Sequence, residues 1–210
     1  MSANEPYTTV EHRGRSEYED RKSVFIGRCA PVTHEEEAIS FLEECRREYP
    51  DAKHHVYAYI LRENAIMRFS DDREPQGTAG VPILDLMRKR GLTDIALVVT
   101  RYFGGTLLGT GGLVRAYTEA AAAAIDDAHV IRYEFFSLFY IRLSYADHAK
   151  FAPIADRFAF RQESVDFSAQ VSLRGSVPSG DAEAFLAALS DATAGRADCE
   201  LIGDFFDFPK

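Results

Sequence analysis

Residues 100–117 read TRYFGGTLLGTGGLVRAY, and this segment carries more structural information than any other in the chain. It follows an apolar run, residues 95–99 (IALVV), and its five glycines lead into apolar side chains at helical spacing. The apolar stripe consists of Leu113, Ala116, Tyr117, Ala120, Ala121 and Ala124. The segment therefore predicts a buried strand, a glycine-rich loop and the first turns of a helix.

The glycine-rich loop has the composition of an anion-binding site. Glycine accepts positive φ values and lets a ligand approach the backbone, and a helix N-terminus presents unpaired N–H groups. Two familiar phosphate-binding templates nevertheless fail, because Thr110 stands where a Walker loop requires lysine and Val114 where a dinucleotide loop requires its third glycine. The alternative is that the glycines only allow a tight turn. The candidate anion- or nucleic-acid-binding residues are Arg101, Tyr102, Gly104, Gly105, Gly109, Gly111, Gly112 and Arg115.

Arg101 and Arg115 flank the loop, and aromatic residues follow Arg101 directly. Guanidinium groups suit phosphate recognition, and exposed aromatic rings stack on bases. We expect both arginines near the surface, which makes this segment the best candidate for RNA contact. The alternative is that the aromatic residues pack inside and that Arg115 pairs with Glu119 one turn on.

The composition is that of a globular protein with two domains. The 210 residues are 46% hydrophobic and 27% charged, which is ample apolar material for a core. No apolar run approaches the ~20 residues that span a bilayer, and the polar N-terminus lacks a signal-peptide core. Three widely spaced cysteines argue against a disulfide framework. We expect a cytoplasmic protein without membrane contact and without a cofactor.

The chain is acidic, with a formal net charge of −9, and both parts share this excess. Up to Arg132 there are 17 basic and 21 acidic residues, and after it there are 7 and 12. Neutralising phosphates requires clustered lysine and arginine. Any affinity for nucleic acid must therefore come from a local basic patch.

The first domain is expected over residues 21–130, after a loose polar lead-in over residues 1–20. Besides the strand and helix above, its predicted elements are a strand over 23–30, a helix capped by Thr33 and Glu36 and stopped by Pro50, a hairpin of strands 56–61 and 65–69, and a helix ended by Gly91.

The second domain is expected over residues 131–210. Its predicted strands cover residues 133–143, 161–166, 168–177 and 198–206, and its helices cover 146–157 and 181–192. The order βαββαβ is typical of a ferredoxin-like arrangement, one antiparallel sheet with two helices on one face. The predicted fold class is thus α+β.

The acidic loop between the hairpin and the next helix is a candidate metal site. Asp71, Asp72 and Glu74 could supply the oxygen ligands that Mg²⁺ prefers. Carboxylates before a helix also serve as caps and as partners of the helix dipole, and this is the more ordinary interpretation.

Two adjacent histidines begin the strand after Lys53. Neighbouring side chains of a strand point to opposite faces, so His54 and His55 cannot easily bind one metal together. His54 is a candidate general base, with Glu74 as the alternative acid or base, because histidine titrates near neutral pH. No serine or cysteine lies in a nucleophile-elbow context.

Four segments together resemble the IMPACT family in its bacterial, YigZ-like, two-domain form. They are residues 53–59 (KHHVYAY), 71–80 (DDREPQGTAG), 99–105 (VTRYFGG) and 108–117 (LGTGGLVRAY). The resemblance implies a first domain like the second domain of ribosomal protein S5 and a second domain like a ferredoxin-like domain of elongation factor G. Arg73 stands where the family usually has glycine.

Eukaryotic members of this family resemble translational regulators. The resemblance and the loop together favour a non-enzymatic binding protein that contacts RNA, the ribosome or a translation factor through the loop residues. The alternative is an enzyme acting on a small phosphorylated ligand at the same loop, with His54 as base and the acidic loop on a metal.

Overall fold

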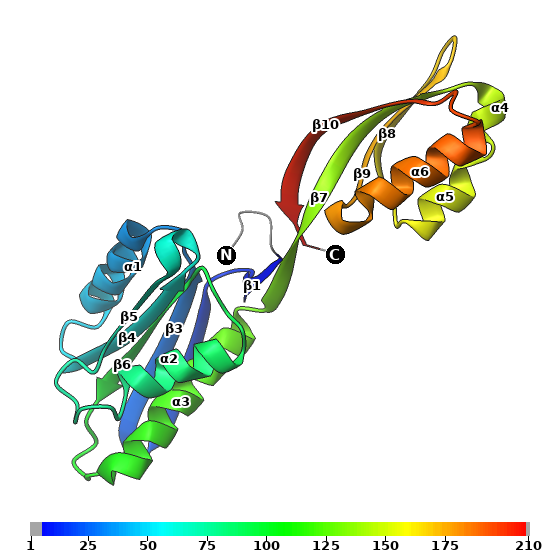
Figure 1. The fold of residues 1–210 in the computed structure, drawn as a ribbon. Coiled ribbons are helices and arrows are strands. Elements are labelled where there is room, and N and C mark those ends of the chain that lie inside the picture. The colour runs from blue at the N-terminus through cyan, green and yellow to red at the C-terminus, as the bar shows by residue number, and fades with distance from the viewer. Residues whose placement is uncertain (1–5, 209–210) are drawn as a thin grey trace. The chain divides into compact units, whose positions relative to one another are not determined.

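The computed structural model describes residues 6–208, and the chain divides into two units at the junction of Arg132 and Tyr133 (Figure 1). This junction lies two residues after the expected boundary. The first unit holds a five-stranded sheet and the second unit contributes four strands to another sheet, each with helices packed on it, so the α+β class predicted from the sequence is confirmed. The two units are described separately below.

The first unit is built around an antiparallel sheet with strand order β2-β3-β6-β4-β5. Its strands are β1 (Tyr7–Val10), β2 (Gly14–Asp20), β3 (Ser23–Pro31), β4 (His54–Leu61), β5 (Ile66–Ser70) and β6 (Ile95–Tyr102). Its helices are α1 (Glu35–Glu48), α2 (Gly80–Lys89), α3 (Gly109–Asp127) and the 3-10 turn η1 (Glu63–Ala65).

Strand β6 is buried on both faces, which explains its unbroken apolar sequence. Alternate residues point to opposite faces of a sheet. Ile95, Leu97 and Val99 pack into the core beneath α2 and α3, whereas Ala96 and Val98 pack into the core beneath α1. The central strand therefore separates two hydrophobic layers, with α1 on one side and α2 and α3 on the other (Figure 1).

Helix α3 lies unusually close to β2 and β3. All six apolar positions predicted for this helix are buried. Ala120 faces Gly27, where an added Cβ would lie 2.4 Å from the Ala120 carbonyl oxygen. Ser16 on β2 donates a hydrogen bond to that same carbonyl, at 2.6 Å. Across residues 6–208, no helix is both long enough and apolar enough to cross a membrane.

Two predictions for the first unit are wrong. Residues 14–20 are not a loose lead-in, because they form β2, which pairs with β3 along its whole length; residues 1–5 lie outside the described residues. The cap of α1 is shifted by one residue from the predicted Thr33 and Glu36. The N-cap is His34, and the Glu37 carboxylate accepts hydrogen bonds from the N–H groups of Thr33 and His34.

The second unit is an antiparallel sheet in the order β10-β7-β9-β8, with its helices packed on one face. Its elements are β7 (Val130–Leu143), α4 (Tyr145–His148), α5 (Phe151–Arg157), β8 (Arg161–Phe167), β9 (Val171–Pro178), η2 (Ser179–Asp181), α6 (Ala182–Thr193) and β10 (Asp198–Asp207). This is the predicted ferredoxin-like order, except that two short helices replace the single one expected over residues 146–157. Phe185 lies at the centre of its core.

Candidate functional site

The loop between β6 and α3 uses its glycines for two different purposes. Gly104 packs against the turn between β2 and β3, where an added Cβ would lie 2.1 Å from the carbonyl carbon of Lys22. Gly105 and Gly109 have φ values of 86° and 73°, in the region that favours glycine. The tight-turn interpretation thus accounts for these three positions, whereas Gly111 has open space around it.

The first turn of α3 is open to a ligand. No side chain caps this helix, and Gly109, Thr110 and Gly111 are exposed. The first N–H groups of a helix have no partner within the helix and carry partial positive charge. The N-terminus of α3 therefore presents unpaired donors at the protein surface.

Arg101 is buried, which corrects the expectation that it lies at the surface. Only 5% of the residue is exposed, and its Nη1 donates a 2.6 Å hydrogen bond to Oε1 of Glu74. The same oxygen accepts a hydrogen bond from the Tyr117 hydroxyl at 2.8 Å. Burial beside the Glu74 carboxylate raises the pKa of Tyr117 far above its usual value. The phenol therefore stays protonated and keeps donating.

One donor of Arg101 has no acceptor. Its Nε is fully buried and forms no hydrogen bond within the described part of the chain. The guanidinium carbon lies 5.3 Å from the ring centre of Phe25 and 5.6 Å from that of Phe103, so aromatic faces supply part of its surroundings. A buried donor without a partner is costly unless a ligand or water satisfies it.

Arg101 lines a cavity of about 430 Å³ at the N-terminus of α3. The cavity has three permanently cationic side chains, one histidine, one carboxylate and an apolar wall. The lining residues are Lys53, His54, Arg73, Glu74, Pro75, Arg101, Phe103, Leu107, Leu108, Gly109, Thr110 and Leu113. We call this space the α3 cavity.

Several predicted site residues lie elsewhere. Tyr102 follows Arg101 on β6, so its side chain points to the opposite face of the sheet, and it does not line the α3 cavity. Arg115 is exposed and pairs with Asp20 of β2 at 3.1 Å, not with Glu119. Of the eight predicted anion-binding residues, the cavity brings together only Arg101 and Gly109.

The carboxylates of the acidic loop do not converge. Asp71 accepts hydrogen bonds from the N–H groups of Gly77, Ala79 and Gly80 at 2.8, 3.1 and 2.7 Å, and so caps α2. Asp72 accepts the N–H of His55 at 2.6 Å. The Asp71 contacts match the capping interpretation of the loop, whereas Asp72 binds a backbone N–H of β4.

Among residues 6–208, a single group of three or more side chains holds metal-ligating atoms within 4.8 Å of one another, and it is not the acidic loop. This group consists of Glu11, His12 and His129. The three acidic-loop carboxylates predicted as an alternative Mg²⁺ site are thus not gathered around one point.

The two histidines of β4 have different surroundings. Nδ1 of His54 donates a hydrogen bond to the carbonyl oxygen of Asp72 at 2.9 Å, and its Nε2 lies 4.0 Å from Oε1 of Glu74. His55 is buried on the other face and lies 3.1 Å from the Thr100 hydroxyl. Burial lowers the pKa of His55 below its usual value. This arrangement agrees with the expectation that His54 and His55 point to opposite faces of the sheet.

Three cationic residues near the loop adopt backbone conformations that favour glycine. Arg21 and Lys22 form the turn between β2 and β3 with φ values of 47° and 65°, and Arg73 has a φ of 71°. Asn-Gly is the usual choice for such a two-residue turn. Arg21 also donates a hydrogen bond to the carbonyl oxygen of Leu107 at 3.3 Å. We call Arg21, Lys22, Lys53 and Arg73 the basic rim.

Sequence reasoning missed the basic rim as part of the site. Arg73 was recognisable as a cation added between two carboxylates, and Lys53 directly precedes the candidate base His54. Arg21 and Lys22 are 80 or more positions before the loop in sequence, and only the contacts of Gly104 and Leu107 bring them to it. No local pattern indicated that proximity.

Comparisons with known proteins identify both halves of the chain. The profile of the Impact N-terminal domain matches residues 21–125, and that of a domain of unknown function, DUF1949, matches residues 141–196. The chain is 33% identical to IMPACT family member YvyE of Bacillus subtilis, over 91% of this chain and 89% of that protein. It is 34% identical to IMPACT family member YigZ of Escherichia coli, over 90% and 91% respectively.

Two further similarities concern the eukaryotic proteins and the fold. Protein IMPACT of Oryctolagus cuniculus is 33% identical over 43% of this chain and 30% of its own length. A solved structure described as a crystal structure of an hypothetical protein aligns with a TM-score of 0.60 and 32% identity, over 95% of this chain and 98% of that one. On these matches, the chain belongs to the IMPACT family.

Proposed function

We propose that this protein is a non-enzymatic, translation-associated binding protein that holds phosphate groups of RNA, including ribosomal RNA, in the α3 cavity. The observation that carries the proposal is the placement of Lys53, Arg73 and Arg101 around the uncapped N-terminus of α3. Family membership supports the link to translation, as expected from the resemblance stated above.

Local charge supports binding of an anion despite the acidity of the chain. The α3 cavity has three permanent cations against a single carboxylate, Glu74. That carboxylate is already engaged by Arg101 and Tyr117. The basic rim adds Arg21 and Lys22, both exposed, on the neighbouring turn. A clustered patch of this kind is what phosphate binding needs.

Backbone donors add to these charges. A phosphate at the N-terminus of α3 would accept hydrogen bonds from N–H groups that have no partner within the helix. The Nε of Arg101 is fully buried, so the donors open to a ligand here are those of the helix backbone.

The apolar wall supports a nucleotide over a simple phosphate ion. Phe103 is 51% exposed and Leu107 is 81% exposed, and both border the cavity that Lys53, Arg73 and Arg101 also line. An exposed aromatic ring beside a phosphate site is suited to stacking on a base. The combination favours single-stranded RNA as the ligand.

The experiment is binding of a short fluorescent single-stranded RNA, and sedimentation with purified ribosomes, across a salt series. Two to three phosphate contacts give a log–log salt slope of roughly 1.5 to 2 for a single strand. The variant with Lys53→Glu and Arg73→Glu should lose binding of both ligands. The matched control is Arg142→Glu with Arg157→Glu in the second unit, which leaves the α3 cavity intact.

A salt-independent interaction, or one that the Lys53 and Arg73 variant leaves unchanged, would overturn the proposal. Retention of ribosome binding with loss of RNA binding would instead point to a contact with the protein part of the ribosome. Arg101 is not used as a test variant. Its removal would leave Glu74 buried without its cation and destabilise the fold.

One observation favours the enzymatic alternative. Because Nδ1 of His54 donates to the Asp72 carbonyl, neutral His54 carries its lone pair on Nε2, inside the α3 cavity. A general base needs such a free nitrogen. His54→Gln should abolish any turnover of a phosphorylated ligand yet leave RNA binding within about twofold, since RNA affinity depends on the permanent cations.

A further inference from the structure

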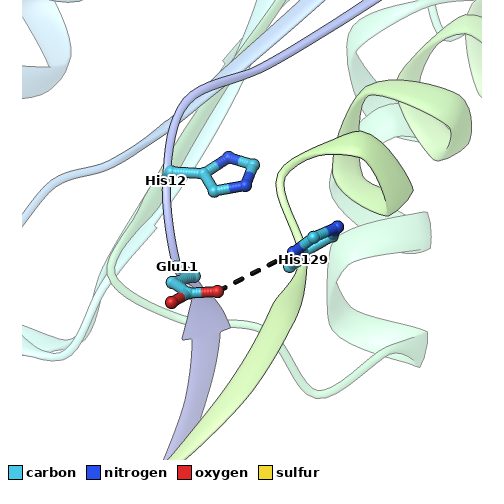
Figure 2. Close-up of side chains that lie close together, drawn as sticks. All are labelled: Glu11, His12 and His129. Carbon is cyan, nitrogen blue, oxygen red and sulfur yellow. Dashed lines mark ion pairs between the residues drawn. The ribbon is translucent and has the colours of Figure 1, made fainter.

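Glu11, His12 and His129 form a compact cluster on the surface of the first unit (Figure 2), and none of them lines the α3 cavity. Glu11 and His12 follow β1, and His129 lies between α3 and β7. All three side chains are exposed, and their potential ligand atoms lie within 4.8 Å of one another. Each is a residue type that binds zinc through a nitrogen or an oxygen.

The backbone holds the two segments together independently of the side chains. The N–H of Glu11 donates to the carbonyl oxygens of Ala128 and His129, at 3.2 and 2.8 Å, and the N–H of His12 donates to that of Ala128 at 3.2 Å. The Cα atoms that carry the cluster are therefore fixed before any ligand binds. A site built this way loses little conformational entropy on binding an ion.

The hydrogen bond of His12 uses Nδ1 and leaves Nε2 available to bind a metal. Its Nδ1 lies 3.1 Å from the carbonyl oxygen of Arg13. A carbonyl oxygen only accepts, so Nδ1 carries the proton and Nε2 of the neutral ring holds the lone pair. Metal-binding histidines commonly donate their other ring nitrogen to a backbone carbonyl in this way.

The spacing of the other two side chains also suits an ion. Nδ1 of His129 and Oε2 of Glu11 are 3.8 Å apart, which is longer than a hydrogen bond (Figure 2). Two zinc ligands at about 2.1 Å from the metal in tetrahedral geometry lie about 3.4 Å apart. An adjustment of a few tenths of an ångström in exposed side chains would bring both atoms onto one ion.

We propose that Glu11, His12 and His129 bind one divalent transition-metal ion of the zinc class, with solvent completing the coordination. Two imidazoles and one carboxylate are a ligand set that leaves the fourth position of zinc open. The ion would fasten the connection between β1 and β2 to the end of α3. This proposal is independent of RNA binding at the α3 cavity.

The backbone of His129 is consistent with a requirement for its side chain. Its φ is 53°, a conformation at the end of α3 where glycine or asparagine is the usual choice. Histidine there costs stability unless its side chain contributes something that glycine cannot.

Other zinc-binding side chains do not compete strongly. Burial raises the pKa of the Cys29 thiol to about 12 and those of Cys45 and Cys199 to about 11, so these cysteines stay protonated at neutral pH. Zinc binds the thiolate form. The remaining histidines include His34, which is exposed and pairs with Glu63 at 2.8 Å but has no second imidazole beside it in the described residues. His34→Gln is therefore the matched control.

The test uses the untagged full-length chain, freed of metal with a chelator and titrated with Zn²⁺ by calorimetry and with Co²⁺ by visible absorption. We expect one ion per chain and a zinc-dependent rise in the melting temperature. His12→Ala and His129→Gly should each weaken binding by more than about tenfold, because loss of a ligand costs at least as much as the roughly 10- to 100-fold loss that follows when an outer-shell partner is removed. His34→Gln should bind as the parent does.

His129→Gly guards against misfolding, because glycine suits the backbone at this position and should preserve or raise the stability of the metal-free protein. Circular dichroism verifies that each variant is folded. Absence of stoichiometric binding, or equal binding by the parent and by the variant lacking both His12 and His129, would overturn the proposal. The proposal would also be overturned if His34→Gln lost zinc binding while His12→Ala and His129→Gly kept it.

Discussion

Two helices of the first unit begin after a loop, and the two N-termini are treated in opposite ways. At α2, the Asp71 carboxylate accepts the N–H groups of Gly77, Ala79 and Gly80, so a side chain of the protein binds the first helical N–H and the two loop donors before it. At α3, no side chain does this, and a cavity with three permanent cations lies beside the free donors. The comparison shows that the acidic loop satisfies backbone donors at one helix N-terminus, whereas the glycine-rich loop leaves those of the other helix open.

The largest effect is expected from removing the cap of α2. Asp71→Ala leaves three N–H groups without their acceptor and should lower the free energy of unfolding by about 3 kcal/mol. Chemical denaturation with urea measures this change. The control is Asp85→Ala, which removes an exposed carboxylate paired only loosely with Arg88 and should change stability by less than about 0.5 kcal/mol. Equal effects would show that Asp71 is not the cap.

The next effect separates stability from binding around α3. Lys22→Gly and Arg73→Gly should each raise the free energy of unfolding by about 1 kcal/mol, because glycine relieves a positive φ. Both should weaken RNA binding, since each removes a cation of the basic rim. Ala194→Gly is the control, because it relieves a φ of 50° at the end of α6 and should stabilise without changing binding. A Lys22→Gly variant that binds RNA normally would exclude the rim from the site.

A smaller effect follows from giving α3 the negative charge that α2 already has. Thr110→Asp places a carboxylate in the exposed first turn and should stabilise the protein by about 0.5 kcal/mol through the helix dipole. The same charge should weaken RNA binding, because it competes for the free donors. Thr110→Asn, similar in shape but neutral, separates charge from size. If Thr110→Asp binds RNA as tightly as Thr110→Asn, the N-terminus of α3 does not contact phosphate.

The smallest effect concerns pH and the link between the acidic loop and β4. Burial lowers the pKa of His55 in the folded protein, with the Asp72 charge opposing that shift. The unfolded chain therefore takes up a proton at about pH 6.5 that the folded protein does not, so stability is full above this pH and falls as the pH decreases below it. Urea denaturation between pH 5 and 8 should show a shallower decrease for His55→Gln. If the stability of His55→Gln falls with decreasing pH as steeply as that of the parent, groups other than His55 cause the decrease.

Much of the fold could be predicted, because its signals are local. The run at residues 95–99 indicated a buried strand, which the structure shows to be covered on both faces, and the apolar stripe of α3 repeats at helical spacing. Strand β2 was missed because its side chains are mostly polar and it lies at the edge of the sheet. Its place depends on the contact of Ser16 with α3, which is 104 positions away in sequence.

The candidate site was predictable only in part. The glycine loop and Arg101 were found from sequence, but the burial of Arg101 depends on Glu74, which is 27 residues earlier. Whether a carboxylate caps a helix or faces a ligand is decided by backbone geometry, as Asp71 and Glu74 show within one loop. Glu11 and His12 gave no signal at all, because their partner His129 is more than 100 residues away.

The buried trio of Arg101, Glu74 and Tyr117 has a consequence for how this protein can change over evolutionary time. Loss of either charged member leaves the other ionised and unpaired inside the protein, at a cost of several kcal/mol. A lineage cannot therefore replace one without a nearly simultaneous change of the other. The cations of the rim carry no such constraint, so Arg21, Lys22, Lys53 and Arg73 can be replaced one at a time while the centre of the cavity stays the same.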